Sequence, residues 1–350
     1  MKMESSNVCV LSNYMKEFTP ARLRTFRRRL GAWYLANHRD LPWRRTTDPY
    51  RIWISEIMLQ QTRVAAVIPY YERFLTRFPD PAALAAASDD DLLNAWAGMG
   101  YYSRARNLRA AARLIVAAGK FPDDYDVLLK LPGIGPYTAA AVSSICFGTP
   151  RAVLDGNVIR VVARLTQDSG DIQSLRTKER LREVAQLLLD PANPAAHNQA
   201  VMELGATICV PRAPRCELCP VSEFCAAHSS GLERELPIKL RRAEIRRERR
   251  TLLVAIRNGK ILLWQRAKDH AMLGGFWELP EPHQLPEANS AKLLIEFSHA
   301  ITNYISDFRV VRTRVGQVAF PLQWTPLGQL PALPLSTVTR KALLGAQIYP

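Results

Sequence analysis

Apolar residues recur at three- and four-residue intervals through most of the first 228 positions of the chain, which is the spacing of helices with one buried face. Turn-forming residues interrupt this spacing at FPDP, residues 78–81, and at GKFP, residues 119–122. This part of the chain is therefore expected to be all-helical. The pattern predicts helices over residues 21–36, 52–71, 89–97, 105–118, 136–147 and 178–188.

The pattern changes to that of strands near residue 251. Apolar runs at 252–256 and 261–265 flank Asn258 and Gly259, and this pair favours a hairpin because both residues tolerate a positive φ. Before them, residues 239–250 carry seven Lys or Arg against two Glu, which indicates a connector. We expect four segments: an N-terminal tail (1–21), a helical domain (22–228), a basic connector (229–250) and a smaller α+β domain (251–350).

Length and charge are consistent with this division. A chain of 350 residues favours two domains, and no apolar run approaches the roughly 20 residues that span a bilayer. The first residues lack the apolar centre of a secretory signal, so we expect a soluble cytoplasmic protein. The net charge of +15 favours a polyanionic partner such as nucleic acid, although a charged surface without a partner would look the same. Charge does not separate DNA from RNA.

Four of the six cysteines lie within 17 residues, in the spacing C-x6-C-x2-C-x5-C. Four thiolates in one loop suit a metal ion or an iron–sulfur cluster, and the spacing leaves zinc and [4Fe–4S] both open. The other two, Cys9 and Cys146, are expected to be a tail thiol and a small core residue. The four candidate ligands are Cys209, Cys216, Cys219 and Cys225.

The segment LPGIG at residues 131–135 stands directly before a predicted helix that opens at Pro136. Gly133 and Gly135 allow the backbone to approach a phosphate closely, and the N–H groups at the helix start can bind it. Such a contact fixes a protein on a duplex without reading its sequence. The alternative is an ordinary tight connection between two helices.

Two carboxylates are candidates for chemistry. Asp155 follows Gly135 by twenty residues and precedes an apolar helix, which it can cap. Glu56 is the one acidic residue in the apolar stretch 52–59, where burial would raise its pKa and suit it to act as a general acid. A solvent-facing glutamate on an amphipathic helix is the alternative. After it, residues 60–62 (QQT) offer polar groups able to bond base edges.

Six ordered motifs over residues 22–228 resemble those of the MutY-type adenine DNA glycosylases. They are LPWR (41–44), SEIMLQQT (55–62), GYYSR (100–104), the glycine hairpin, LDGN (154–157) and the four cysteines. The resemblance implies a helix-hairpin-helix glycosylase of two helical lobes, with DNA in the cleft between them and a [4Fe–4S] cluster on the cysteines. It also implies hydrolysis of the N-glycosidic bond of adenine that is mispaired with 8-oxoguanine or guanine, which leaves an abasic site.

The same resemblance assigns roles to individual residues. Glu56 matches the acid that protonates adenine at N7, and Asp155 matches the carboxylate that stabilises the sugar cation. The other matching positions are Tyr137 and Asn157 beside these two groups, Gln61 and Tyr101 as residues that wedge into the duplex, and Arg44, Gly133 and Gly135 as further DNA contacts.

Tyr137 separates this chain from relatives that also cut the strand. Endonuclease III places a Schiff-base lysine at this position, and no lysine occurs here between Lys130 and Lys178. We therefore expect base removal without an efficient lyase step, by a monomer acting on duplex DNA with A:8-oxoguanine or A:G mispairs and not on a membrane. A lesion-binding protein without chemistry is a hypothesis of another class, and the intact Glu56 and Asp155 disfavour it.

The C-terminal part resembles the MutT-like, or Nudix-type, domain with which the family recognises 8-oxoguanine. The matching segments are LLWQR (262–266) and GGFWELP (274–280). Phe297, Ser298 and His299 resemble the short loop that contacts the oxidised base, and the end of a core strand is the alternative. The Glu-rich helix of true Nudix hydrolases is absent from the sequence, so pyrophosphatase activity is not expected. Only 16 residues separate Pro280 from Phe297, which puts one helix of the domain in question.

Overall fold

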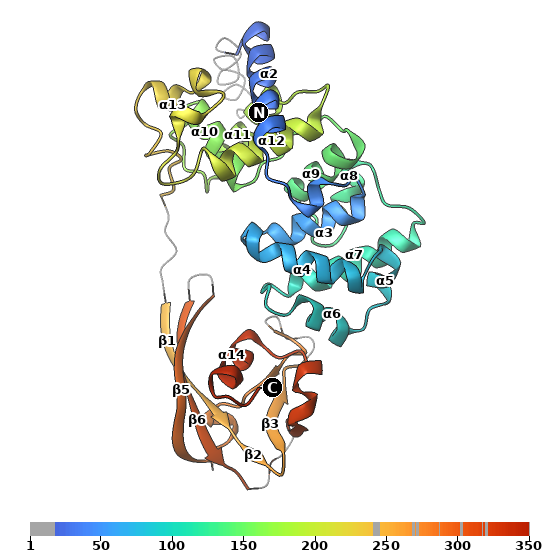
Figure 1. Cartoon of the computed structure of the whole chain (residues 1–350), viewed down its shortest axis with the longest axis vertical. Coiled ribbons are helices and arrows are strands. Elements are labelled where there is room, and N and C mark those ends of the chain that lie inside the picture. Colours follow the sequence, from blue (N-terminus) through green and yellow to red (C-terminus); the bar gives the residue numbers. More distant parts are fainter. Residues whose placement is uncertain are drawn as a thin grey trace, which may run out of the picture. The chain divides into compact units, whose positions relative to one another are not determined.

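The computed structural model describes residues 18–240, 246–267, 270, 273–286, 288–301, 304–316, 318 and 321–349 (Figure 1). The predicted tail lies largely outside these residues, as does Cys9. The chain forms two compact units. One joins the described residues up to 71 with 114–240, and the other joins 72–113 with the described residues from 246 onward. None of the described helices is both long and apolar enough to cross a bilayer.

The first unit is helical, and its helix starts follow capping rules. Asp48 caps α3 through the Tyr50 N–H at 2.9 Å, with proline at the first helical position. The elements are α2 (Pro20–Asn37), η1 (Pro42–Arg44), α3 (Pro49–Leu59), the start of α4 (Val64–Arg77), α8 (Tyr125–Leu128), α9 (Pro136–Phe147), α10 (Gly156–Leu165), α11 (Leu175–Leu188), α12 (Pro194–Thr207), η2 (Cys216–Leu218), η3 (Ser222–Phe224) and α13 (Ala226–Ser229).

The predicted helices are confirmed except for one. Residues 52–71 form two helices, α3 and α4, because Gln61 adopts a left-handed φ of 57° that ends the first. The break leaves Gln61 exposed between the two helices. Helix α9 is apolar on all sides and is buried from Thr138 to Ile145. Helices α3, α8 and α12 pack around α9, so the predicted motifs at the end of α3 and between α8 and α9 adjoin one buried helix.

The second unit begins with the rest of α4, α5 (Pro81–Ala86), α6 (Asp89–Trp96) and the larger part of α7 (Ser103–Ala117). Phe74 packs edge-on against Trp96 with ring centroids 5.7 Å apart. The same helices contact the C-terminal domain. The buried rings of Tyr102 and Phe276 lie 4.2 Å apart, and the Asn94 amide donates to the Ala332 carbonyl at 2.7 Å.

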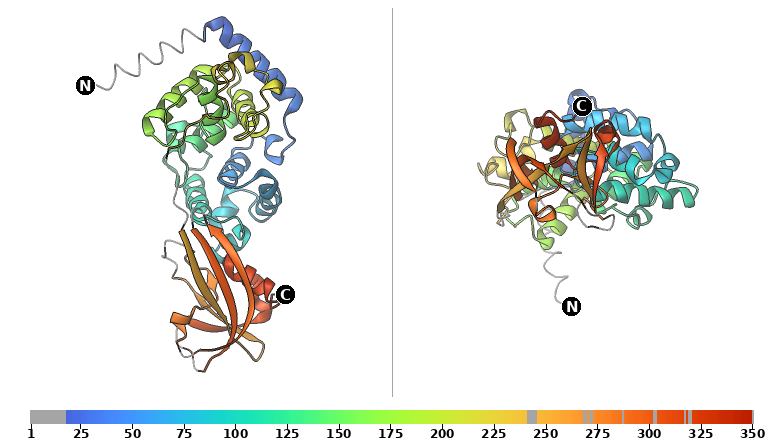
Figure 2. Two further views of the ribbon diagram at one scale, coloured as in Figure 1. Left: turned by 90° about the vertical axis from the view of Figure 1, so that its left-hand side faces the viewer. Right: turned by 90° about the horizontal axis from the view of Figure 1, so that it is seen from below.

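The C-terminal strands form two sheets (Figure 2). In one sheet, of order β1-β6-β5, β1 and β6 are parallel and β5 and β6 are antiparallel. In the other, β3 pairs with β2, β4 and β7. The strands are β1 (Arg246–Val254), β2 (Ile256–Arg257), β3 (Lys260–Gln265), β4 (Trp277–Glu278), β5 (Asn289–Ile301), β6 (Tyr304–Arg314) and β7 (Leu322–Pro326), and the short helices are η4 (Pro282–Gln284), η5 (Leu327–Ala332) and α14 (Thr337–Gly345).

The predicted hairpin at Asn258 and Gly259 is confirmed, with φ of 51° and 70°. The predicted strand 252–256 is divided, because β1 ends at Val254 in one sheet and β2 belongs to the other. Strand β1 also takes residues 246–250 out of the predicted connector. One core joins both sheets to α14, with Leu252, Ile261, Phe308 and Leu343 among its buried members.

Candidate active site

A cavity of about 560 Å³ opens within the first unit, between residues of η1, α3, α12 and the starts of α9 and α10. Sequence positions far apart meet here because α3 and α12 pack against buried α9, and α10 packs against α12. Glu56, Tyr137, Asp155 and Asn157, the four predicted catalytic residues, all line the cavity.

Glu56 is 5% exposed, and burial raises its pKa to about 7. The Tyr137 hydroxyl donates a hydrogen bond to its Oε2 and opposes the rise, whereas the nearby charge of Asp155 adds to it. The phenol also lies 3.4 Å from Met202 Sδ, so it is held between the carboxyl and an apolar side chain. A carboxyl with this pKa is partly protonated at neutral pH and can therefore deliver a proton.

Asp155 caps α10, as its sequence position predicted. Its Oδ1 accepts from the Val158 N–H at 2.7 Å, and its Oδ2 accepts from the Asn157 amide at 3.1 Å. Burial raises the pKa of Asp155, and these two hydrogen bonds oppose that rise. Capping and a chemical role are compatible because the side chain also lines the cavity.

Arg160 connects this capping group to the cysteine loop. Its Nη2 donates to Asn157 Oδ1 at 2.9 Å and to the Gly205 carbonyl at 2.6 Å, and its Nε donates to the Cys209 carbonyl at 2.7 Å. A Cβ on Gly205 would stand 2.7 Å from that of Asn157, so only glycine allows α12 this close. The position of the Asn157 amide therefore depends on α12 and on the cysteine loop.

A second buried glutamate, Glu203 on α12, was missed in the sequence analysis. It is fully buried and accepts from Arg39 at 2.8 and 2.7 Å and from Arg44 at 2.7 Å. Burial alone would raise its pKa, but these hydrogen bonds outweigh burial and lower the pKa to about 2. The available signal was its place as the one acid in an apolar helix, the same signal that identified Glu56.

Arg44, which is predicted to contact DNA, lies in the wall of the cavity. Its side chain is 10% exposed, and its two terminal nitrogens donate to Glu203 and to the Arg39 carbonyl. The guanidinium also lies over the Tyr34 ring, 5.6 Å from the centroid. Arg44 therefore forms part of the cavity wall and is already paired with a carboxylate.

The glycine hairpin connects α8 to α9 as predicted. Gly133 has a φ of 77°, a left-handed conformation that glycine adopts without strain, and the Ile134 N–H closes the turn onto Leu131 at 3.2 Å. Gly135 is the N-cap of α9 and offers no side chain to cap it. The N–H groups at the start of α9 therefore have no partner from a capping side chain.

In the second unit, Tyr101 follows Gly100 in a left-handed conformation with φ of 49°. Arg104 holds the turn by donating to the Met99 and Gly100 carbonyls at 3.1 and 3.3 Å, and its guanidinium lies 5.2 Å from the Tyr101 ring centroid. The Tyr101 side chain is left 42% exposed, whereas its neighbour Tyr102 is buried.

The four predicted cysteine ligands line one small cavity that also contains Arg164. Arg164 is 1% exposed, and it donates to Cys209 Sγ at 3.1 Å. Burial raises the pKa of Cys219 to about 12 and that of Cys225 to about 11, so these thiols need a metal to become thiolates at neutral pH.

The four sulfurs by themselves suit either a zinc ion or an iron–sulfur cluster. In the described part of the chain, a group of three possible ligand atoms within 4.8 Å of one another joins Cys216 to His228 and Glu233. No disulfide joins any described cysteine, and Cys146, predicted to be a small core residue, is half-buried on α9.

The three residues expected to read 8-oxoguanine lie within β5 and not in a loop. Phe297 stacks on Phe308 with centroids 5.3 Å apart, Ser298 Oγ donates to Asp307, and His299 Nδ1 lies 3.4 Å from Lys341 Nζ. The ladder between β5 and β6 continues through all three, which is the physical reason for the difference. Ser298 is nevertheless exposed.

Comparison with known proteins gives the class of this chain. Residues 54–187 match the HhH-GPD superfamily base excision DNA repair proteins, and residues 209–225 match the iron–sulfur binding domain of endonuclease III. A solved thermostable thymine-DNA glycosylase is 30% identical with a TM-score of 0.56, over 61% of this chain and 99% of that one. An endonuclease III–DNA complex, 22% identical with a TM-score of 0.52 over 61% and 98%, shares the fold. The fold is thus that of a helix-hairpin-helix glycosylase with a [4Fe–4S] cluster.

Curated relatives narrow the class. An adenine DNA glycosylase of Mycobacterium tuberculosis is 41% identical over 205 residues, which are 58% of this chain and 67% of that protein. Those of Rattus norvegicus and Arabidopsis thaliana are 45% and 38% identical, over 58% and 74% of this chain. The chain belongs to the adenine DNA glycosylase family. It spans less than half the length of the rat and Arabidopsis relatives, 42% and 48%.

Proposed function

We propose that this protein removes adenine mispaired with 8-oxoguanine, or with guanine, from duplex DNA and leaves an abasic site. The observation that carries the proposal is Glu56, a buried carboxyl whose pKa is raised to about 7, in one cavity with Asp155 and Tyr137. Membership of the adenine DNA glycosylase family supports the choice of base. We expect a monomer that acts on chromosomal DNA in the cytoplasm.

Adenine must leave the base stack to enter this cavity, at an unstacking cost of a few kcal/mol. Glu56 then donates its proton to N7, which makes adenine a better leaving group. The Tyr137 hydroxyl orients the Glu56 carboxyl for this transfer and afterwards stabilises the carboxylate that remains. Since the proton has to be present first, the reaction depends on the raised pKa of Glu56.

Asp155 stabilises the positive charge that develops on the deoxyribose as the base departs. This role requires a charged carboxylate, and the hydrogen bonds from Val158 and Asn157 favour that form against the effect of burial. Water then adds at the anomeric carbon and gives its proton to the Glu56 carboxylate, which restores the acid. The two carboxyls thus divide the work, one as the acid and the other as a negative charge.

Contacts to the duplex are assigned to three places. The N–H groups beside Gly133 and Gly135 bind a phosphate, because the start of α9 lacks a capping side chain. The exposed side chains of Gln61 and Tyr101, each on a left-handed residue, wedge into the base stack. Arg44, the remaining predicted DNA contact, would act from the cavity wall, where it pairs with Glu203.

Tyr137 at the position of a Schiff-base lysine supports base removal without strand cleavage. Tyr137→Lys should place an amine near the reacting carbon, so that borohydride traps a covalent complex with DNA. The parent protein should give little trapped product. Heavy trapping by the parent would mean that another lysine reaches the sugar and that the reaction is not purely hydrolytic.

The residues proposed to hold the [4Fe–4S] cluster are Cys209, Cys216, Cys219 and Cys225, which line one cavity. When bound, the cluster cross-links the four thiolates and offers one-electron redox chemistry. Anaerobically purified protein should be yellow-brown, with broad absorbance at about 400 nm. A colourless protein with one zinc per chain would contradict this assignment.

Recognition of 8-oxoguanine is assigned to Phe297, Ser298 and His299 in β5. Ser298 is the exposed member, and its present bond to Asp307 would have to be exchanged for one to the base. Ser298→Ala should therefore reduce the preference for adenine opposite 8-oxoguanine over adenine opposite guanine by about fivefold, from the loss of one hydrogen bond of about 1 kcal/mol. An unchanged preference would place lesion reading elsewhere.

The deciding experiment compares substrates. Purified protein is incubated with duplexes carrying A opposite 8-oxoguanine, A opposite G, and T opposite G, and abasic sites are revealed by alkali. Adenine should be released from the first two duplexes. The third duplex tests the competing function that the 30% identical thymine-DNA glycosylase suggests. Release of thymine without adenine would overturn the proposal.

A further inference from the structure

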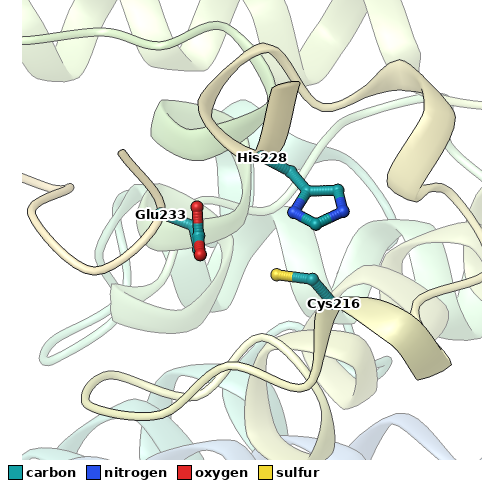
Figure 3. A group of neighbouring side chains, drawn as sticks. All are labelled: Cys216, His228 and Glu233. Atoms are coloured by element: carbon teal, nitrogen blue, oxygen red, sulfur yellow. The ribbon is translucent and has the colours of Figure 1, made fainter. Parts of the chain in front are cut away.

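Two metal-binding side chains lie beside Cys216 in addition to the other cysteines (Figure 3). One ligand atom each of Cys216, His228 and Glu233 lies within 4.8 Å of the other two. His228 and Glu233 also line the cavity that the four cysteines share. Small side-chain rotations would bring all three ligand atoms onto one metal ion.

The local chain path produces this grouping. His228 lies on the short helix α13, and Gly231 turns the chain back with a φ of 71°. The Leu232 N–H then donates to the Ala227 carbonyl at 2.8 Å, which fixes the segment after Gly231 against α13. Glu233 follows directly and points back toward Cys216 (Figure 3).

Glu233 carries a polar atom that needs a partner. Its Oε2 is buried and has no hydrogen-bond partner among the described residues. A buried carboxylate oxygen is costly unless it is paired or coordinates a metal. The cavity that it lines is the cysteine cavity, so this oxygen is available to an iron ion there that lacks a ligand.

We propose that His228 and Glu233 form a reserve ligand pair for the iron that Cys216 binds, able to hold that iron when the Cys216 thiolate is lost. Imidazole nitrogen and carboxylate oxygen are both accepted iron ligands. In the exchange, the iron–sulfur bond to Cys216 breaks and an iron–nitrogen or iron–oxygen bond forms. The thiolate takes a proton from water, and no oxidation state changes. Cys216 is therefore the replaceable ligand of the four.

Matched cysteine variants of the full chain test this proposal. Cys216→Ala and Cys219→Ala are purified anaerobically, and iron per chain and absorbance near about 400 nm are measured. Cys216→Ala should keep at least about half of the parent's iron, whereas Cys219→Ala should lose nearly all of it, because no reserve pair adjoins Cys219 in the described part of the chain. Adding His228→Ala and Glu233→Gln to Cys216→Ala should remove the iron.

The control is His228→Ala with Glu233→Gln in a chain that keeps Cys216, which should bind iron like the parent. The proposal is overturned if Cys216→Ala is as poor in iron as Cys219→Ala, or if it cannot be obtained as a soluble iron protein while the parent can. It is also overturned if the triple variant keeps its iron. Because iron content is the readout, these outcomes are independent of whether adenine is the base removed.

Discussion

Two buried glutamates line the same cavity, and their surroundings give them opposite acidities. Burial raises the pKa of Glu56 to about 7. Glu203 is buried at least as fully, yet hydrogen bonds from two arginines lower its pKa to about 2. The comparison teaches that burial alone does not make a general acid. The decisive difference is the direct partner: Glu56 is bonded to a neutral phenol and Glu203 to two guanidinium groups.

Because of this difference, the two sides of the cavity have different chemical properties. The Glu56 side can hold a transferable proton at neutral pH, whereas the Glu203 side holds a fixed ion pair. Arg44 is shared, because it pairs with Glu203 and its charge also lowers the pKa of Glu56. The Glu203 carboxylate thus prevents Arg44 from acting on Glu56 with its full charge.

The largest effect is expected for Glu56→Gln. An amide of nearly the same shape cannot deliver the proton, so single-turnover excision of adenine should fall by about 10²–10⁴-fold while DNA affinity is kept. In the parent, excision should fall as pH rises through about 7, because Glu56 then loses its proton. Excision by Glu56→Gln near the parent rate would remove the distinction between the two glutamates.

Glu203→Gln should cost stability more than chemistry. Leaving Arg39 and Arg44 without their carboxylate should lower the free energy of unfolding by about 3 kcal/mol, measured by urea denaturation at pH 7. The pKa of Glu203 is depressed, so its stabilising contribution is present above about pH 4.5 and is lost as pH falls toward about 2. The variant should therefore lose less stability over that acid range than the parent.

The same variant reports on Glu56. With Glu203 neutral, the uncompensated charge of Arg44 should lower the pKa of Glu56, and the alkaline limb of the pH–rate profile should move to lower pH. A limb that stays in place would show that the two sides of the cavity are not coupled through Arg44. Stability and pH profile are separate readouts, so either part of the prediction can fail alone.

Tyr137→Phe sharpens the comparison from the other direction. The phenol stabilises the Glu56 carboxylate, so its removal should raise the pKa of Glu56 further and move the alkaline limb to higher pH. The maximal rate should fall by about tenfold through loss of one hydrogen bond to a charged group. A shift of the limb to lower pH would contradict the assigned direction of this bond.

The smallest effect is expected for Arg44→Lys. Lysine keeps the positive charge near Glu203 but cannot bond Glu203 and the Arg39 carbonyl at once. If charge sets the two acidities, the pH–rate profile should keep its position and excision should change by less than about fivefold. A large displacement of the profile would mean that the planar geometry of the arginine, and not its charge, governs Glu56.

Local sequence patterns predicted the groups whose surroundings come from one segment. Glu56 stands in a helix that is apolar around it, Asp155 stands directly before a helix, and the cysteines share one loop, so each could be identified by itself. Glu203 could not be understood in this way, because its partner Arg44 is 159 positions away. Its low pKa depends on packing that no local pattern contains.

Three further structural features could not be predicted from local sequence patterns. The break between α3 and α4 depends on the left-handed Gln61, a residue without glycine's usual signal. The parallel pairing of β1 with β6 joins segments almost sixty residues apart in register, such as Arg246 with Tyr304. The strand pairing of Phe297 with Phe308 replaced the expected loop for a similar reason. Pairing partners are set by the sheet as a whole.

The contact between Tyr102 and Phe276 has a consequence for grafting and truncation. An aromatic pair contributes about 0.5–1.5 kcal/mol beyond the area it buries, and here one ring stands in the turn before α7 and the other belongs to the C-terminal domain. Deleting residues from 251 onward would bare Tyr102, the direct neighbour of Tyr101. The C-terminal domain therefore cannot be exchanged freely for that of a relative. A transplanted domain would need its own aromatic side chain in the place of Phe276, because otherwise Tyr102 in the Gly-Tyr-Tyr turn would be exposed to solvent.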